Sequence, residues 1–112
     1  MQRLPKRFIS GSQLTTGAVV YYTAPANTVS TISAMSVTNT TGTARTATIH
    51  LVPSGGTADA TNVVCSARTV SPGETFNVFG AIGQTMAAGG TIQALADAAT
   101  ALTLVASGYE QA

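Results

Sequence analysis

Turn-forming residues recur along this chain, and the segments between them alternate apolar and hydroxyl side chains. A period of two places successive side chains on opposite faces of a β-strand. Short strands separated by turn signals at roughly eight to twelve residues are the pattern of a sandwich or barrel. The sequence therefore predicts an all-β fold.

Seven segments fit this pattern. We expect strands over residues 18–22, 29–38, 44–52, 62–69, 75–79, 91–96 and 101–109. The alanines at 93–104 leave a helix there as the alternative, but flanking β-branched and hydroxyl residues favour strands. The alternation also predicts which side chains share a face. These sets are Ala47, Ile49 and Leu51 (core) against Thr46, Thr48 and His50; Leu102, Leu104 and Ala106 against Thr103, Val105 and Ser107; and Met35 and Val37 against Ile32 and Ala34.

Proline and glycine mark the connections. Residues 71–74 (Ser-Pro-Gly-Glu) predict a type II turn, because proline suits its second position and glycine its third, where φ is positive. Residues 39–42 (Asn-Thr-Thr-Gly) predict another turn. Gly80, Gly83, Gly89 and Gly90 predict further turns and a bulge, since no lysine follows them at a phosphate-binding spacing.

A chain of 112 residues holds one domain with a modest core. We expect an N-terminal arm over residues 1–13, which carry basic charge without a clear period, followed by the sandwich domain over 14–112. The domain is predicted to be a single antiparallel β-sandwich, Ig-like or jelly-roll-like, of about seven to eight strands.

Charge is scarce. Nine of the 112 residues are Lys, Arg, Asp or Glu, where a typical soluble domain is about 25% charged. Such a surface indicates a subunit that other proteins cover, and the alternative is a small monomer solubilised by hydroxyl groups. A net charge of +1 predicts no nucleic-acid partner. No apolar run is long enough for a membrane span, and the basic N-terminus lacks the apolar stretch of a secretory signal.

No set of residues predicts catalysis, a cofactor or a metal ion. His50 is the single histidine, and its place on the expected outer face predicts a solvated side chain. Asp59, Glu74, Asp97 and Glu110 fall in separate loops and ends. Cys65 stands alone among apolar neighbours, which predicts a buried, inert thiol and a chain made in a reducing cytoplasm. The chain is therefore expected not to be an enzyme.

Several turn and strand-end motifs resemble those of small bacteriophage virion proteins. They are Tyr-Thr-Ala-Pro-Ala at 22–26, Asn-Thr-Thr-Gly at 39–42, Val-Pro-Ser-Gly-Gly at 52–56 and Ser-Gly-Tyr-Glu at 107–110. The resemblance covers about residues 19–110. The resemblance implies a β-sandwich that coats or extends a phage particle, as head decoration proteins and tail or fibre components do, and it implies no catalytic residue.

The candidate interface residues lie in the arm and the first strand. In the arm, basic and apolar side chains interleave, as expected of a segment that lies along a neighbouring subunit; a disordered end is the alternative. The adjacent tyrosines must point to opposite faces of their strand, and the outward ring is available for an interface or for capping the sheet edge. The candidates are Arg3, Leu4, Lys6, Arg7, Phe8, Ile9, Tyr21 and Tyr22.

The sequence thus predicts a non-enzymatic virion structural protein, located in the virion and made in the host cytoplasm. Head decoration is the first choice, and a tail, baseplate or fibre component is the second. The expected partners are further copies of the chain and the major capsid protein or tail proteins, with no membrane. A carbohydrate-binding module is the rival from a different class, and it would need solvent-facing aromatic side chains grouped on one surface.

Overall fold

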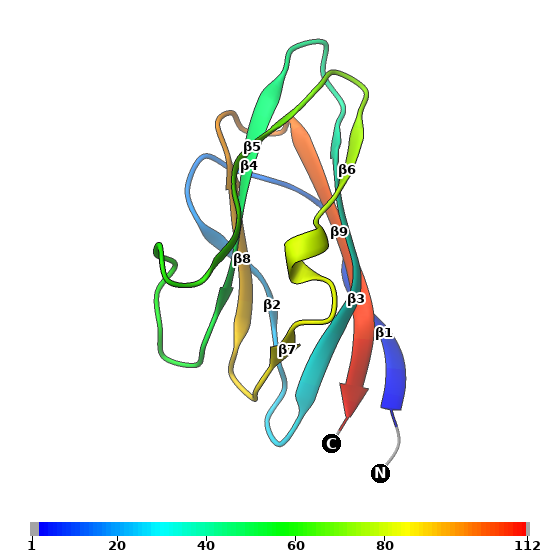
Figure 1. Ribbon diagram of the computed structural model, residues 1–112, viewed down its shortest axis with the longest axis vertical. Coiled ribbons are helices and arrows are strands. Elements are labelled where there is room, and N and C mark those ends of the chain that lie inside the picture. The colour runs from blue at the N-terminus through cyan, green and yellow to red at the C-terminus, as the bar shows by residue number, and fades with distance from the viewer. Residues whose placement is uncertain (1–2, 112) are drawn as a thin grey trace.

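The computed structural model describes residues 3–111, which form two antiparallel sheets stacked as a sandwich (Figure 1). One sheet has the order β1-β9-β3-β6, with β7 also paired to β3, and the other has the order β2-β8-β4-β5. The elements are β1 (Arg3–Gln13), β2 (Val19–Thr23), β3 (Val29–Asn39), β4 (Arg45–Val52), β5 (Val63–Val70), β6 (Thr75–Asn77), the 3-10 turn η1 (Phe79–Ala81), β7 (Thr85–Met86), β8 (Thr91–Ala96) and β9 (Leu102–Gln111). The all-β sandwich is confirmed, and the alternative helix at 93–104 is wrong.

The order of the strands is that of a jelly roll. β6 and β7 both pair with β3, so they form two parts of one interrupted strand, the sixth of eight. The pairs are then first with last (β1 with β9), second with seventh (β2 with β8), third with sixth and fourth with fifth. A long antiparallel hairpin folded over on itself gives this pairing, and the β3–β9 and β4–β8 ladders close the two sheets.

Alternation predicted the inward faces of β4 and β9. Ala47 and Ile49 are buried, Leu51 packs against the core, and Leu102, Leu104 and Ala106 are buried. The prediction for Ile32 is wrong, because Ile32 is buried on the same side as Met35. The β3–β9 register shifts between Ile32 and Ala34, and one extra residue in a strand reverses the facing of all that follow.

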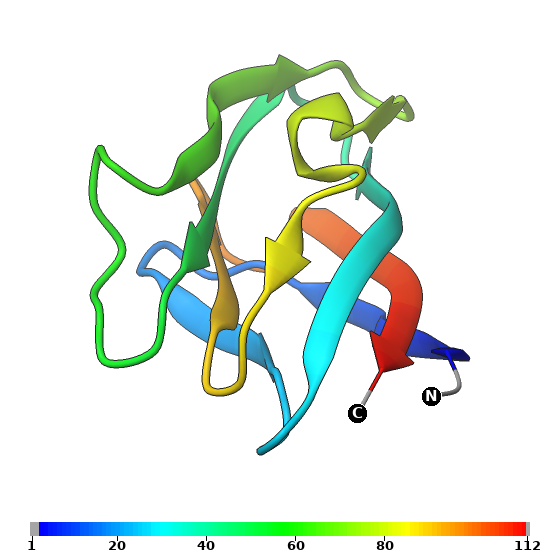
Figure 2. The same ribbon diagram turned by 60° about the horizontal axis from the view of Figure 1, so that its bottom comes forward.

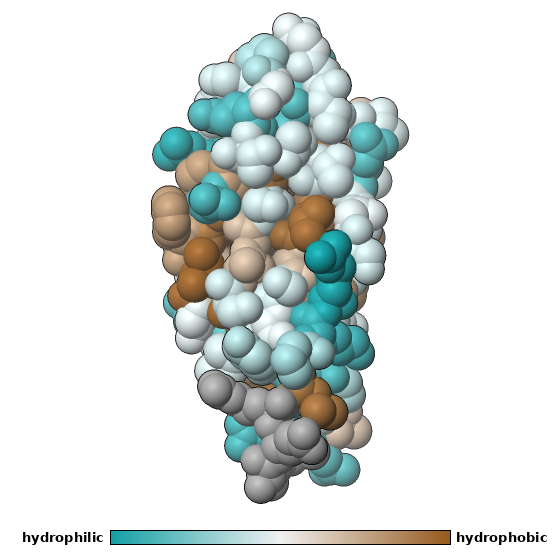
Figure 3. Space-filling view, turned by 90° about the vertical axis from the view of Figure 1, so that its right-hand side faces the viewer, coloured by the Kyte–Doolittle hydropathy of each residue, from teal (hydrophilic) through white to brown (hydrophobic). Residues whose placement is uncertain are grey.

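The outer faces of the strands are short of charge. Figure 3 looks at the side that carries β1, β9 and β3, where pale residues of intermediate hydropathy lie between separate brown apolar patches and teal hydrophilic ones. Outward positions of β9 are Thr103, Val105 and Ser107, all half-buried by their neighbours. This composition of small hydroxyl and aliphatic side chains leaves the surface with few charges to keep other proteins away.

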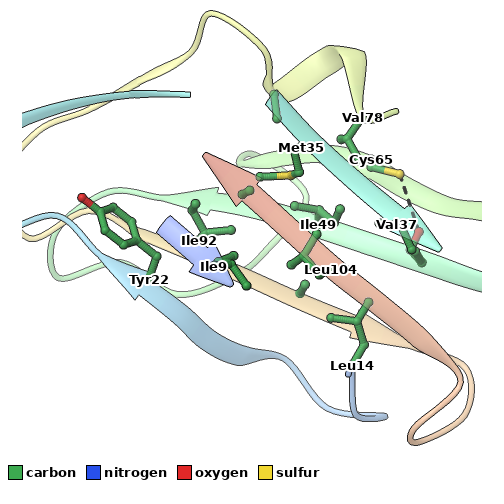
Figure 4. Packing of buried hydrophobic residues seen from close by; sticks show 14 of the residues in the cluster. Ile9, Leu14, Tyr22, Met35, Val37, Ile49, Cys65, Val78, Ile92 and Leu104 are labelled. Carbon is green, nitrogen blue, oxygen red and sulfur yellow. Dashed lines mark hydrogen bonds between the residues drawn. The ribbon is translucent and has the colours of Figure 1, made fainter. Parts of the chain in front are cut away.

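The core lies between the sheets and is built from both (Figure 4). Leu14, Ile32, Ile49, Ile92 and Leu104 are its largest fully buried aliphatic side chains, together with Met35 and Leu102. Cys65 is buried at its margin, as predicted, and its Sγ donates to the carbonyl of Ala47 at 3.7 Å. Burial raises the pKa of this thiol, which keeps it in the unreactive protonated form.

The turn at 71–74 is confirmed. Gly73 has a φ of 74°, and the amide of Glu74 donates to the carbonyl of Ser71 at 3.0 Å. The turn at 39–42 is built by Asn39, whose side chain is buried. Its Nδ2 donates to the carbonyls of Thr43 and Val70 at 2.8 and 2.9 Å, and its Oδ1 accepts from the amide of Thr41. One amide side chain therefore joins three segments at this end of the sandwich.

The expected N-terminal arm is a strand of the sandwich. Residues 3–13 form β1, which pairs with β9 from Arg3 opposite Gln111 to Gln13 opposite Thr103. Two register shifts, on either side of Ile9, turn both Phe8 and Ile9 inward, where both are buried. The prediction of an arm separate from the domain at 14–112 is therefore wrong for the described residues, since this segment pairs with β9 and buries Phe8 and Ile9.

Candidate interaction surface

Tyr22 ties the two sheets together near the chain ends. It comes from β2, and its hydroxyl reaches the other sheet, where it donates to Glu110 Oε2 at 2.5 Å. With its hydrogen so used, the Tyr22 oxygen accepts from the Ser30 hydroxyl at 2.8 Å. The ring stacks on Phe8 with centroids 4.3 Å apart. Tyr22 is therefore a structural residue of this chain.

The charge in this cluster is balanced within the molecule. Lys6 Nζ lies 3.4 Å from the Glu110 Oε2 that Tyr22 also contacts. Burial and the hydrogen bond to Glu110 raise the pKa of Tyr22 to about 12, because both disfavour a phenolate beside a carboxylate. The cluster therefore holds a neutral phenol against an ion pair, and no part of it is arranged for chemistry.

The eight predicted interface residues do not form one surface. Phe8, Ile9 and Tyr22 are buried in the sandwich, which corrects the expectation that they contact a partner. Lys6 is occupied by Glu110. The side chain of Arg3 lies outside the described residues.

The remaining three candidates are accessible but dispersed. Leu4 is 54% exposed on β1. Arg7, also exposed, borders a shallow hollow of about 320 Å³ on the outer face of the same sheet. Tyr21 is half-buried on β2 of the other sheet, and its hydroxyl donates to the carbonyl of Gln13 at 3.4 Å. Tyr21, like Tyr22, packs against the core, and the β2–β8 register shifts between Val20 and Tyr22, so the two tyrosines do not divide between opposite faces as predicted.

His50 is buried and serves the loop that joins β4 to β5, contrary to its predicted solvated position. Its Nδ1 donates to Asn62 Oδ1 at 2.9 Å, and Asn62 Nδ2 donates to the carbonyl of Thr57 at 2.8 Å. Hydrogen bonds from the side chain and backbone of Thr61 lower the pKa of Asp59 in the same loop. These contacts shape a loop that protrudes from the sandwich (Figure 2).

The other acids also bond to nearby groups. Glu74 Oε1 accepts from the amide of Ser71 at 2.9 Å, and Asp97 Oδ1 accepts from the amide of Thr46 at 3.2 Å. Within residues 3–111, no three His, Cys, Asp or Glu side chains are grouped so that they could hold a metal ion.

Long stretches of the chain around β4, β5 and η1 lack charged residues, with Asp59 and Arg68 at their margins; Arg68 lies over the ring of Phe76. Residues 46–58, 60–67 and 75–96 contain no Lys, Arg, Asp or Glu. They supply most of β4 and β5 together with η1, β7 and β8. Between β4, β5 and β7 lie two hollows of about 170 and 330 Å³, whose walls share Leu51, Pro53 and Thr85. We call this region the uncharged side.

Phe79 and Ile82 project beside these hollows. They are 72% and 40% exposed; Phe79 begins the η1 turn and Ile82 follows it, where the turn interrupts the sixth strand (Figure 1). Gly80 in η1 lies against β5 so closely that a Cβ there would stand 2.7 Å from the carbonyl oxygen of Val64. Val64 also lines the larger hollow. The sequence analysis missed both residues, although two large apolar side chains, each followed by a glycine in a charge-free stretch, were a usable signal.

Comparisons with known proteins leave the family open. No family model and no curated protein matches the chain. One solved structure, described as infectious bursal disease virus Gx strain, is 18% identical with a TM-score of 0.46. The alignment covers 97% of this chain and 30% of that one. A likeness this weak carries no argument about function. Separately, no helix within residues 3–111 has the length and apolar character needed to cross a bilayer.

Proposed function

We propose that this chain is a non-enzymatic structural protein of a bacteriophage virion, with head decoration as its role. The observation that carries the proposal is the uncharged side, where exposed Phe79 and Ile82 adjoin two hollows with no charged lining residue. Exposed apolar surface of this kind marks sites of protein contact. The jelly roll is a recurrent fold of capsid domains, and the sequence motifs resemble those of phage virion proteins.

The mechanism is burial of surface area. Each Å² of apolar surface removed from water stabilises a complex by about 25 cal/mol, and a standard interface covers about 800 Å² on each partner. The described chain exposes 5589 Å², so one such contact takes about a seventh of its surface. Because the surface has few charged groups, the free-energy cost of removing it from water is small. Contacts to further copies and to the major capsid protein would then stiffen the shell.

Two other roles remain as alternatives. A tail, baseplate or fibre component would also act by burying surface against its neighbours, at another place on the particle. A carbohydrate-binding module is less well supported, because the aromatic side chains do not gather on one surface. Phe79 is the one exposed ring, Tyr21 and Tyr109 are half-buried on different sheets, and Arg68 lies over the ring of Phe76 at 4.3 Å.

The test is to look for the chain in purified particles of the phage whose genome encodes it. Cryo-electron microscopy and gold labelling should place the chain on the head at symmetric positions. Particles assembled without the chain should break at a lower temperature than complete particles, and adding the purified chain should bring the breaking temperature back up. Absence from the particle would overturn the proposal, labelling of the tail would favour the second role, and binding to glycans with no binding to particles would favour the third.

A further inference from the structure

The η1 turn is an excursion from a strand that could have continued. The first part of the sixth strand, β6, pairs with β3, and the amide of Val78 still donates to the carbonyl of Met35 in β3. The chain then leaves β3 and returns at Gly83, whose amide donates to the carbonyl of Ile32 at 2.7 Å. Between these points lie the three residues of η1 (Phe79–Ala81) and Ile82, which follows it. Within the excursion, Ala81 is buried, whereas Phe79 and Ile82 face solvent. The excursion thus buries Ala81 between the sheets and leaves two apolar side chains exposed.

The excursion is held firmly enough to act as a rigid projection. Amides of Ala81 and Ile82 donate to the carbonyls of Val78 and Phe79 at 3.1 and 3.2 Å. The side chain of Gln84 donates to the carbonyl of Gly80 at 3.2 Å. A projection that is already ordered loses little conformational entropy when a partner covers it.

The neighbouring hollow has the size and lining to receive an aromatic ring. It measures about 170 Å³, and Leu51, Val52, Pro53 and Met86 form its apolar wall. An engineered apolar cavity of about 150 Å³ is known to bind benzene. The projection and the hollow lie on the same side of the molecule, which is the requirement for reciprocal insertion about a two-fold axis.

Charge favours a second copy of the chain as the occupant. A two-fold contact places like residues near one another, so a charged face would repel itself. The walls of both hollows and the excursion contain no Lys, Arg, Asp or Glu. The other exposed large apolar residues, which are Leu4, Val19, Val20 and Val29, line neither of these hollows.

We propose that the uncharged side is a two-fold interface between copies of this chain, in which Phe79 of each copy enters the hollow walled by Leu51, Pro53 and Met86 of the other. This inference rests on the proposed structural role in the virion, and it specifies which surface makes the contact between copies of the chain. The contact to the virion is then made by other surfaces of the dimer.

The test is the molar mass in solution, measured by light scattering from micromolar to millimolar concentration. The wild-type chain should be a dimer, and Phe79→Asp should weaken association by at least about tenfold because it puts a charge into the partner's apolar hollow. Thr85→Lys, which changes the rim of both hollows, should do the same. The matched control is Val20→Asp, at a residue that is 47% exposed on β2, and it should remain dimeric.

Mixing provides the sharper result. Phe79→Asp and Thr85→Lys chains, each monomeric alone, should associate with each other, since the new carboxylate of one meets the new ammonium of the other. A misfolded variant could not be rescued in this way, and circular dichroism of each variant gives a second check. A monomeric wild type, or Phe79→Asp that still dimerises, would overturn the inference. If the chain is a monomer but still binds virions, the interface is wrong and the proposed virion role stands. If the chain is a dimer but is absent from virions, the virion role is wrong and the interface stands.

Discussion

The β1–β9 end and the uncharged side use their apolar residues in opposite ways. At the β1–β9 end, Phe8 and Ile9 turn inward through irregular pairing, and Lys6 and Tyr22 both contact Glu110. On the uncharged side, Phe79 and Ile82 are exposed where the chain leaves β3 between Val78 and Gly83. The first region completes the fold, and the second departs from it.

This difference separates residues that stabilise the chain from residues available to a partner. A basic and apolar N-terminus is a reasonable interface candidate until its pairing with β9 is known. Once paired with β9, this segment buries Phe8 and Ile9 and places Lys6 against Glu110 within the chain. The η1 excursion buries Ala81 and packs Gly80 against β5, but it leaves Phe79 and Ile82 exposed, and exposed apolar side chains are the better indication of an interface. Four substitutions can break or sharpen this comparison.

The largest effect is expected from Gly108→Ala. A Cβ at Gly108 would overlap the carbonyl oxygen of Thr31 and stand 2.9 Å from Cε2 of Phe8. Because the obstructing atom is backbone, β1, β9 and β3 must shift, and we expect a loss of about 3 kcal/mol in the free energy of unfolding. Denaturant unfolding measures it. The control is Gly42→Ala, which meets nothing within 4 Å, and equal losses in both variants would contradict the account.

Tyr22→Phe should have the next largest effect. It keeps the ring stacked on Phe8 but leaves Glu110 and Ser30 without their partner, at a cost of about 1–2 kcal/mol. The pKa of Tyr22 is about 12 in the folded chain against 10.0 for the free side chain. Its stabilisation is thus complete below pH 10 and is lost as the pH rises through 12.

Unfolding midpoints at pH 8 and near pH 12 measure this second effect. Wild type should lose more stability between the two conditions than Tyr22→Phe does, because the variant has no phenol to ionise at this position. A spectroscopic titration should show one late-ionising tyrosine that disappears in the variant. Parallel pH dependence of the two proteins would show that Tyr22 is not coupled to the fold as described.

Lys6→Ala should cost less than about 1 kcal/mol, since the Lys6 side chain is 49% exposed and solvent screens its pairing with Glu110. The loss should shrink further in high salt. Thermal unfolding at low and high ionic strength checks this. A loss as large as that of Tyr22→Phe would mean that the ion pair, and not the phenol, holds the sheets together.

Phe79→Ala should have the smallest effect on folding. The ring is 72% exposed in the single chain, so its removal should leave the free energy of unfolding of the monomer nearly unchanged, within about 0.5 kcal/mol. Denaturant unfolding at concentrations too low for association is the measurement. A loss of several kcal/mol would show that Phe79 belongs to the fold, as Ile9 does.

Much of the sandwich could be predicted, because alternation and turn chemistry are local. The strand at β4, the inward faces of β9 and the type II turn at 71–74 all followed from neighbouring residues. The prediction failed where pairing between distant segments decides the outcome. Ile32 faces inward because of a register shift opposite Gly108, and β1 joins the sheet through β9, about a hundred residues later in the chain.

The candidate surface was hardly predictable for the same reason. The expected strand at 75–79 does contain β6, but nothing local indicates that residues 79–82 leave β3 and that the pairing resumes at β7. The two hollows exist only because β4, β5 and β7 meet. The scarcity of charge was visible in the sequence, and the fold gathers much of the charge-free chain on one side.

Hydrogen–deuterium exchange at low and high protein concentration tests the central claim most directly, because it reads both regions in one experiment. The account predicts that amides in residues 79–86 and 61–65 become slower to exchange as the concentration rises, while those of β1 keep one rate throughout. Concentration-dependent protection of β1, with none around η1, would contradict it and return the interface to the N-terminal segment.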